Sequence, residues 1–147
     1  MTANWRPSAS IDIIRLRAAT LNAIRLFMEE RGIMEVETPV FSRYGNTDPN
    51  LRSFCTPFAP PAETGPVRLY LNTSPEFAMK RLLAAGSGPI FQLARVFRDG
   101  ELGRAHQPEF TMLEWYRPGF DHHRLMDELA RLLAVLGFEP CERLAYA

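Results

Sequence analysis

Two strand-like runs separated by a polar loop are the feature that most limits how this chain can fold. Residues 89–98 and 109–117 are rich in the aromatic and branched side chains that favour β-strands. Residues 99–108 between them are mostly polar and contain glycine and proline. Neighbouring strands joined by one loop pair antiparallel, so an antiparallel hairpin is predicted. Hairpin loops usually take about two to five residues, and this longer loop calls for a functional explanation.

Three further segments have the apolar periodicity of α-helices. Each begins after residues that can cap a helix and ends at a glycine. We place Pro75 in the first turn of the second helix, where proline is favoured. The expected starts and stops are Ser8 or Ser10 with Gly32, Thr73-Ser74-Pro75-Glu76 with Gly86, and Asp121 with Gly137. The third helix carries a leucine stripe that we interpret as core, made of Leu125, Leu129, Leu132 and Leu136.

The remaining segments complete a pattern of mixed helices and strands. Residues 33–37 are expected to form a half-buried strand, in which Met34 and Val36 alternate with glutamates. Residues 41–67 are rich in glycine and proline and indicate a loop or an edge hairpin, and residues 68–71 indicate a strand. We therefore predict one α+β domain, an antiparallel sheet flanked by helices, over the whole chain.

Charge and composition argue against several classes of function. Lysine and arginine total 17, and aspartate and glutamate also total 17, whereas nucleic-acid binders usually carry a basic excess. The two cysteines, Cys55 and Cys141, lack zinc-site spacing and are expected to be free thiols of a reducing compartment. The sequence has neither a secretory signal nor an apolar run of membrane-spanning length. We therefore expect a cytoplasmic protein that has no membrane partner.

Polar residues around the predicted hairpin suggest sites for an anion and for a cation. Arg98 ends the first strand run, and the loop after it adds Glu101 and His106. A guanidinium at a strand end can donate two hydrogen bonds to a phosphate. Glu114 and Tyr116 lie two residues apart and share one strand face, where an acid and a phenol suit an ammonium group. The alternative is that Arg98 and Glu114 form a cross-strand ion pair and that His106 is an ordinary loop residue.

Three blocks of sequence resemble a known family. Val96-Phe97-Arg98 followed by His106-Gln107-Pro108-Glu109-Phe110 is similar to motif 2 of the class II aminoacyl-tRNA synthetases, in its lysyl form, which would span about residues 96–117. Residues 30–39, from Glu30 to Pro39, resemble motif 1. Between them, Thr73-Ser74-Pro75-Glu76 and Lys80-Arg81-Leu82-Leu83 are similar to the lysyl subgroup. The resemblance implies a class II synthetase-like catalytic fold, of which residues 1–147 would be the N-terminal portion.

One branch of the lysyl group is the most similar. Residues 114–118 (Glu-Trp-Tyr-Arg-Pro) and 98–101 (Arg-Asp-Gly-Glu) resemble the branch that joins (R)-β-lysine to elongation factor P and lacks an anticodon-binding domain. The resemblance implies that lysine or (R)-β-lysine is activated with ATP as an adenylate and then transferred to a lysine of elongation factor P. It also implies a homodimer. The balanced charge agrees better with a protein acceptor than with tRNA.

The resemblance also implies roles for individual residues. Arg98 would hold the α-phosphate of ATP and is the expected catalytic residue. The other expected ATP contacts are Asp99, Gly100, Glu101, His106 and Gln107, with Gln107 standing where the lysyl pattern usually has asparagine. Pro39 would lie at the dimer interface. The expected amino-acid pocket comprises Ser74, Pro75, Glu76, Glu114 and Tyr116.

Motif 3 of the class is the part of the pattern that is missing. It supplies a glycine-rich segment with an arginine near the γ-phosphate, and nothing after Tyr116 resembles it or the acid that binds Mg²⁺. The resemblance places the Mg²⁺ ligands in a C-terminal half, so we expect these 147 residues alone to be incomplete or inactive. Two alternatives stay open: a fragment of a lysyl-tRNA synthetase that charges tRNA, and a non-catalytic module that binds a partner or dimerises.

Overall fold

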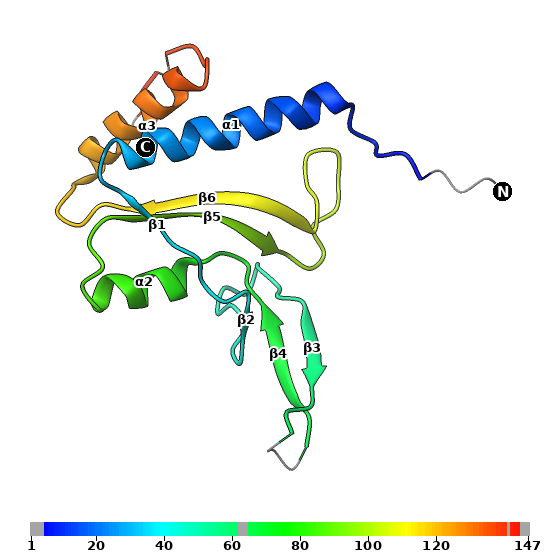
Figure 1. Cartoon of the computed structure of the whole chain (residues 1–147). Helices are drawn as coiled ribbons and strands as arrows, with labels where there is room; N and C mark the ends of the chain where they lie inside the picture. The colour runs from blue at the N-terminus through cyan, green and yellow to red at the C-terminus, as the bar shows by residue number, and fades with distance from the viewer. Residues whose placement is uncertain (1–4, 62–64, 141, 145–147) are drawn as a thin grey trace. The chain divides into compact units, whose positions relative to one another are not determined.

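The structure is a computed structural model that describes residues 5–61, 65–140 and 142–144. Helices are combined with strands that pair mostly antiparallel, which confirms the predicted α+β fold class (Figure 1). The chain divides into two compact units, Met1–Ile33 with Gly119–Ala147, and Met34–Pro118. The elements in order are α1 (Ile11–Glu29), β1 (Met34–Glu35), β2 (Phe41–Ser42), β3 (Cys55–Phe58), β4 (Val67–Leu71), α2 (Glu76–Ala84), β5 (Ile90–Phe97), β6 (Glu109–Tyr116) and α3 (His122–Val135).

The predicted hairpin is the centre of the second unit. Strands β5 and β6 pair antiparallel along their full lengths, from Ile90 opposite Tyr116 to Phe97 opposite Glu109. Strand β5 supplies most of this unit's buried apolar side chains, because residues on both of its faces are covered. These are Ile90, Phe91, Ala94 and Val96, to which α2 adds Met79. The long β5–β6 loop therefore leaves from a firmly paired ladder.

The third strand of this sheet differs from the prediction in direction, length and burial. Strand β1 has two residues and pairs parallel with β5, so the sheet order is β1-β5-β6 and the sheet is mixed. The side chain of Met34 is 51% exposed, so the prediction that it faces the core was wrong. The physical reason is that β1 lies at the sheet edge, where backbone bonds from Met34 to Pro89 and from Val36 to Phe91 hold it without side-chain burial.

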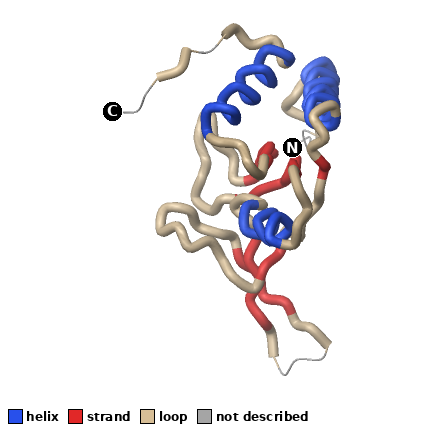
Figure 2. The backbone as a smooth tube through the Cα atoms, turned by 90° about the vertical axis from the view of Figure 1, so that its left-hand side faces the viewer, coloured by secondary structure: helices blue, strands red, loops and turns tan. Residues whose placement is uncertain are grey.

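A second, smaller sheet fills the region predicted as a loop or an edge hairpin. Its order is β2-β4-β3, with both pairings antiparallel, and β4 confirms the strand predicted at residues 68–71. The end of β4 is tied to the larger sheet, because the Phe97 amide donates to the Asn72 carbonyl at 2.9 Å. This bond brings the start of α2 beside the end of β5, and Figure 2 shows α2 lying against the strands of this unit.

Helix α2 begins one residue later than predicted. Pro75 is the residue before the first helical turn and not part of it. The Ser74 hydroxyl accepts a hydrogen bond from the Glu76 amide at 3.4 Å, so a hydroxyl does precede the helix as expected. Gly86 follows the helix with φ of 87°, a conformation that favours glycine.

The other unit contains α1 and α3, which contact each other. Ser10 caps α1 and Asp121 caps α3, each through its side chain, as the sequence indicated. The leucine stripe on α3 was only partly right, since Leu132 is buried but Leu129 is 41% exposed. The buried line of α3 passes through Glu128 and Leu132, one turn apart, and leaves Leu129 at its margin.

Candidate active site

One face of the β5–β6 hairpin carries the two groups that were expected to bind an ammonium ion. Glu114 and Tyr116 lie on one face of β6, and the Tyr116 hydroxyl donates to the Glu114 carboxylate at 2.6 Å. Glu114 lies opposite Gln92 on β5, which places Gln92 on the same face. The predicted sharing of a face is confirmed, and both side chains are partly buried.

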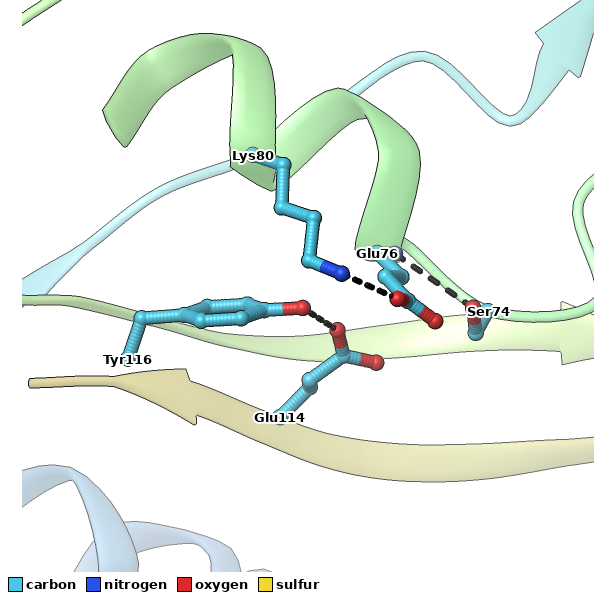
Figure 3. A network of polar contacts seen from close by, with 5 residues as sticks. All are labelled: Ser74, Glu76, Lys80, Glu114 and Tyr116. Carbon is cyan, nitrogen blue, oxygen red and sulfur yellow. Dashed lines mark hydrogen bonds and ion pairs between the residues drawn. The ribbon is translucent and has the colours of Figure 1, made fainter. Parts of the chain in front are cut away.

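The first turn of α2 brings a second carboxylate to this face. Glu76 is held at its amide by Ser74, and its carboxylate Oε1 lies 2.5 Å from the ammonium Nζ of Lys80. Figure 3 shows Glu76 and Lys80 of α2 gathered with Glu114 and Tyr116 of β6. The result is a cluster of two carboxylates, one phenol and one ammonium.

Burial and the neighbouring charges shift the protonation of the hairpin pair. Burial raises the pKa of Glu114, the hydrogen bond from Tyr116 opposes that rise, and the nearby Glu76 charge adds to it. The pKa of Tyr116 is also raised, by burial and by its bond to the Glu114 carboxylate, so its hydroxyl keeps its proton. A protonated phenol beside an ionised carboxylate leaves carboxylate oxygens available to accept from a cation.

Arg98 lies directly after β5, at the start of the loop. Its Nε donates to the Thr73 carbonyl at 3.4 Å, and its Nη1 lies 3.6 Å from Glu101. Its guanidinium also stacks over the Phe110 ring, 5.2 Å from the centroid. The alternative pairing with Glu114 is not formed: among the described residues Glu114 pairs with Gln92 across the ladder, far from the strand end where Arg98 lies.

The turn after Arg98 is fastened to a segment that sequence reasoning did not consider. The Asp99 amide donates to the Arg52 carbonyl at 2.9 Å, and Arg52 Nη2 lies 3.6 Å from the Asp99 carboxylate. Gly100 follows with φ of 84°. No local pattern could have indicated this contact, because Arg52 comes from the segment before β3.

The remaining predicted site residues are either exposed on the loop or buried before α2. His106 and Gln107 are exposed on the outer part of the loop, where the Gly103 amide donates to the His106 carbonyl. Pro75 is fully buried directly before α2. The structure thus gathers Ser74, Glu76, Glu114 and Tyr116 at one place and Arg98, Asp99, Gly100 and Glu101 at the strand end.

Lys80 is a site residue that sequence reasoning missed as such. It was noted only as part of a block similar to the lysyl subgroup, although its spacing of four from Glu76 puts both side chains on one helix face. The i, i+4 rule could have indicated the pair. The approach of β6 to α2 has no comparable local signal.

A cavity of about 410 Å³ lies beside the start of α2. Its lining includes residues 39–46 and 71–75 and part of α2. Ser74 and Pro75 of the expected amino-acid pocket therefore line it, whereas Glu76, Glu114 and Tyr116 do not. Asn46 closes part of it, donating through Nδ2 to the buried Thr73 hydroxyl at 2.6 Å. The cavity is therefore a neighbour of the candidate site and not its centre.

Neither a metal cluster nor a membrane-spanning helix is found in the described part of the chain. Within residues 5–61, 65–140 and 142–144, no three His, Cys, Asp or Glu side chains are grouped so as to hold a metal ion. No helix in those ranges has the length and apolar character needed to cross a membrane. Cys55 is a free, exposed thiol as expected, whereas Cys141 lies outside the described residues.

The sequence of the chain matches the model of a known family. The family model described as tRNA synthetases class II (D, K and N) matches residues 2–139. The chain therefore belongs to the class II tRNA synthetase family.

Within this family, the chain is similar to several ligases that share one name. The chain is 55% identical over 144 residues to the elongation factor P–(R)-β-lysine ligase of Pasteurella multocida, covering 97% of this chain and 45% of the relative. It is 57% identical over 143 residues to the ligase of the same name from Pseudoalteromonas translucida, covering 97% and 44%. The ligase of Salmonella enteritidis is 55% identical over 146 residues, covering 99% and 45%. The chain thus spans less than half the length of these relatives.

Proposed function

We propose that the protein carrying these residues activates (R)-β-lysine with ATP and joins it to a lysine of elongation factor P. The observation that carries the proposal is the meeting of Glu76 from α2 with the Glu114–Tyr116 pair from β6. Paired carboxylates beside a protonated phenol favour an ammonium-bearing substrate. The names of the relatives, which are ligases for (R)-β-lysine and elongation factor P, support the choice of amino acid and acceptor.

The amino-acid half of the site works by charge and shape. A substrate ammonium would donate to the carboxylate oxygens of Glu114 and Glu76, with Tyr116 holding the Glu114 carboxylate in place. Ser74 and Pro75 would shape the pocket by fixing where α2 begins. Because Glu114 is partly buried, its bond to a cation would be strengthened by the lower local dielectric.

The nucleotide half of the site starts at Arg98. The substrate carboxylate attacks the α-phosphorus of ATP, the bond to the bridging oxygen breaks, and pyrophosphate leaves with that electron pair. Arg98 would donate to the α-phosphate oxygens and stabilise the charge of the transition state. The other proposed ATP contacts are Asp99, Gly100, Glu101, His106 and Gln107. Mg²⁺ would neutralise phosphate charge when bound, and the described residues do not group three His, Cys, Asp or Glu side chains that could hold it.

The acceptor step needs a lysine amine from a protein. That amine would attack the adenylate carbonyl, forming an amide and releasing AMP. We also propose a homodimer with Pro39 at its interface, one catalytic domain that includes residues 1–147, and a cytoplasmic location.

The test uses protein expressed from the complete reading frame. It is given ATP and either (R)-β-lysine or lysine, and the exchange of labelled pyrophosphate into ATP is measured; elongation factor P and lysine tRNA are then offered as acceptors. The proposal expects exchange and transfer to elongation factor P. Transfer to tRNA instead would establish a tRNA synthetase, and absence of exchange with every amino acid would establish a non-catalytic module.

A further inference from the structure

Lysine occurs once in this chain. Of the 17 basic residues that are lysine or arginine, Lys80 is the single lysine and the other basic positions are arginine. That one ammonium belongs to the cluster formed with Glu76, Glu114 and Tyr116, and it lies 2.5 Å from the Glu76 carboxylate. An ammonium is a compact point charge, whereas a guanidinium is a wide planar fork. The use of lysine and not arginine at position 80 therefore indicates that this position requires a compact positive charge.

Two hydrogen bonds hold Glu76, one at its backbone amide and one at its carboxylate. Its amide donates to Ser74 at the start of α2, and its Oε1 accepts from Lys80 one helical turn later. The Glu76 side chain is 45% exposed, so burial alone does not fix its rotamer. A glutamate that is not fixed must lose rotamer freedom when it binds a ligand. Lys80 removes that freedom beforehand and leaves the second carboxylate oxygen of Glu76 available.

Lys80 also offsets the repulsion between two like charges. Glu76 and Glu114 lie near each other (Figure 3), and the Glu76 charge disfavours ionisation of Glu114. The pKa of Glu114 responds to both neighbours, raised by the Glu76 charge and lowered by the Lys80 charge. The ammonium therefore lets two carboxylates stand together before a cationic substrate arrives.

We propose that Lys80 is the positioning residue of the amino-acid pocket, holding Glu76 by its Oε1 so that the other oxygen is presented to the substrate's ammonium group. The inference rests on the proposed function, since it assigns a role within the same pocket. Lys80 does not contact the reacting carboxylate in this role and acts only through Glu76. Replacing Lys80 should weaken binding of the amino acid and leave binding of ATP unchanged.

The first experiment compares variants of protein from the complete reading frame by pyrophosphate exchange. Lys80→Met should raise the KM for (R)-β-lysine about tenfold, while the KM for ATP stays within about twofold and kcat changes little. Lys80→Arg keeps a donor and a charge but replaces the compact ammonium with a wide planar fork, so it should recover only part of the loss. Arg81→Met is the matched control, because it removes a positive charge from the next residue of α2 without touching Glu76, and it should match wild type.

The second experiment needs no activity and uses the 147-residue chain itself. With lysine labelled by ¹³C and ¹⁵N, the Hε–Cε signals come from the single lysine and need no assignment. If Lys80 is fixed by its contact with Glu76, its two Hε protons should have distinct shifts. These shifts should merge in Glu76→Gln and stay separate in the control variant Glu29→Gln. Merged shifts in the wild type would overturn the proposal, because Lys80 would then not hold Glu76.

The outcomes separate this inference from the proposed function. Wild-type protein without exchange activity contradicts the proposed function, and the NMR comparison then decides the Lys80 contact by itself. Wild-type activity with an unchanged amino-acid KM in Lys80→Met overturns the positioning role. A lower KM in Lys80→Met also overturns it, because that result would mean that Lys80 competes with the substrate for Glu76. Equal loss in Lys80→Met and Arg81→Met would overturn it as well, because the effect would then be one of general charge.

Discussion

The hydrogen bond from Tyr116 to Glu114 sets how the pocket should respond to pH. Burial raises the pKa of Glu114 above 4.5, and the bond from Tyr116 partly reverses that rise. Since a substrate ammonium needs the ionised carboxylate, amino-acid binding is complete above the raised pKa and weakens as the pH falls through it. For folding the sign is opposite: the protonated form of Glu114 favours the folded state at low pH, and that contribution is lost as the pH rises through the raised pKa.

Tyr116→Phe tests this coupling. It removes the bond that lowers the pKa of Glu114, so the pH at which the amino-acid KM begins to rise should move upward. The measurement is the pH dependence of that KM, together with the ¹³C shift of the Glu114 carboxyl. Tyr44→Phe, at an exposed tyrosine outside the network, should leave the profile unchanged. A downward move in Tyr116→Phe would contradict the assignment of the hydrogen bond.

Arg98 and Arg95 form a natural pair for testing the nucleotide role. Arg98 follows β5 directly, whereas Arg95 lies within the strand and pairs with Glu109 at 3.5 Å. Arg98→Ala removes a charge-assisted contact worth about 1.5–3 kcal/mol, so exchange should fall by about ten- to hundredfold. Arg95→Ala should retain the exchange activity of the wild type. Near wild-type exchange in Arg98→Ala would remove Arg98 from the proposed mechanism.

Among the elements, the long hairpin loop depends on how its first turn is anchored. Gly100 has φ of 84°, and a Cβ added there would lie 2.7 Å from Arg52 Nη2. Gly100→Ala should therefore lower the free energy of unfolding by about 1 kcal/mol. Gly103→Ala lies in the same loop with no atom within 4 Å of the added Cβ and should be close to neutral. Thermal unfolding of both variants measures the difference, and equal melting temperatures would mean that the turn is not anchored.

The elements also show why the sequence revealed some parts of the fold and not others. Strands β5 and β6 were predictable because the eight residues of each are rich in β-forming side chains, and the face shared by Glu114 and Tyr116 follows from their spacing. Strand β1 has two residues, too few for any period, so its parallel pairing had no local signal. The contact between Arg52 and Asp99 joins segments far apart in sequence. The roles of the site residues came from resemblance and stay predictions.

For the whole molecule, the exposed apolar side chains of α1 bear on assembly. The first half of this helix exposes Ile11, Ile13, Ile14 and Leu16, the last of which is 62% exposed. Several large apolar side chains exposed on one short stretch of helix are typical of a surface that a partner covers. Together with the resemblance of residues 30–39 to motif 1, they lead us to predict that residues 11–39 form a self-associating edge. The predicted species is a homodimer.

Sedimentation velocity over a range of concentrations tests this prediction. The wild-type chain should sediment as a dimer. Burying these apolar side chains contributes a favourable free energy of about 25 cal/mol for each Å² of apolar surface removed from water. Leu16→Glu places a charge in the covered region, where an unpaired charge is costly, and should shift the protein toward monomer. Asn22→Glu adds the same charge at an exposed polar position of the same helix and should leave the dimer intact. A wild-type chain that stays monomeric at the highest concentration would show that residues 11–39 do not associate by themselves. A dimer that persists in Leu16→Glu would place the interface elsewhere on the chain.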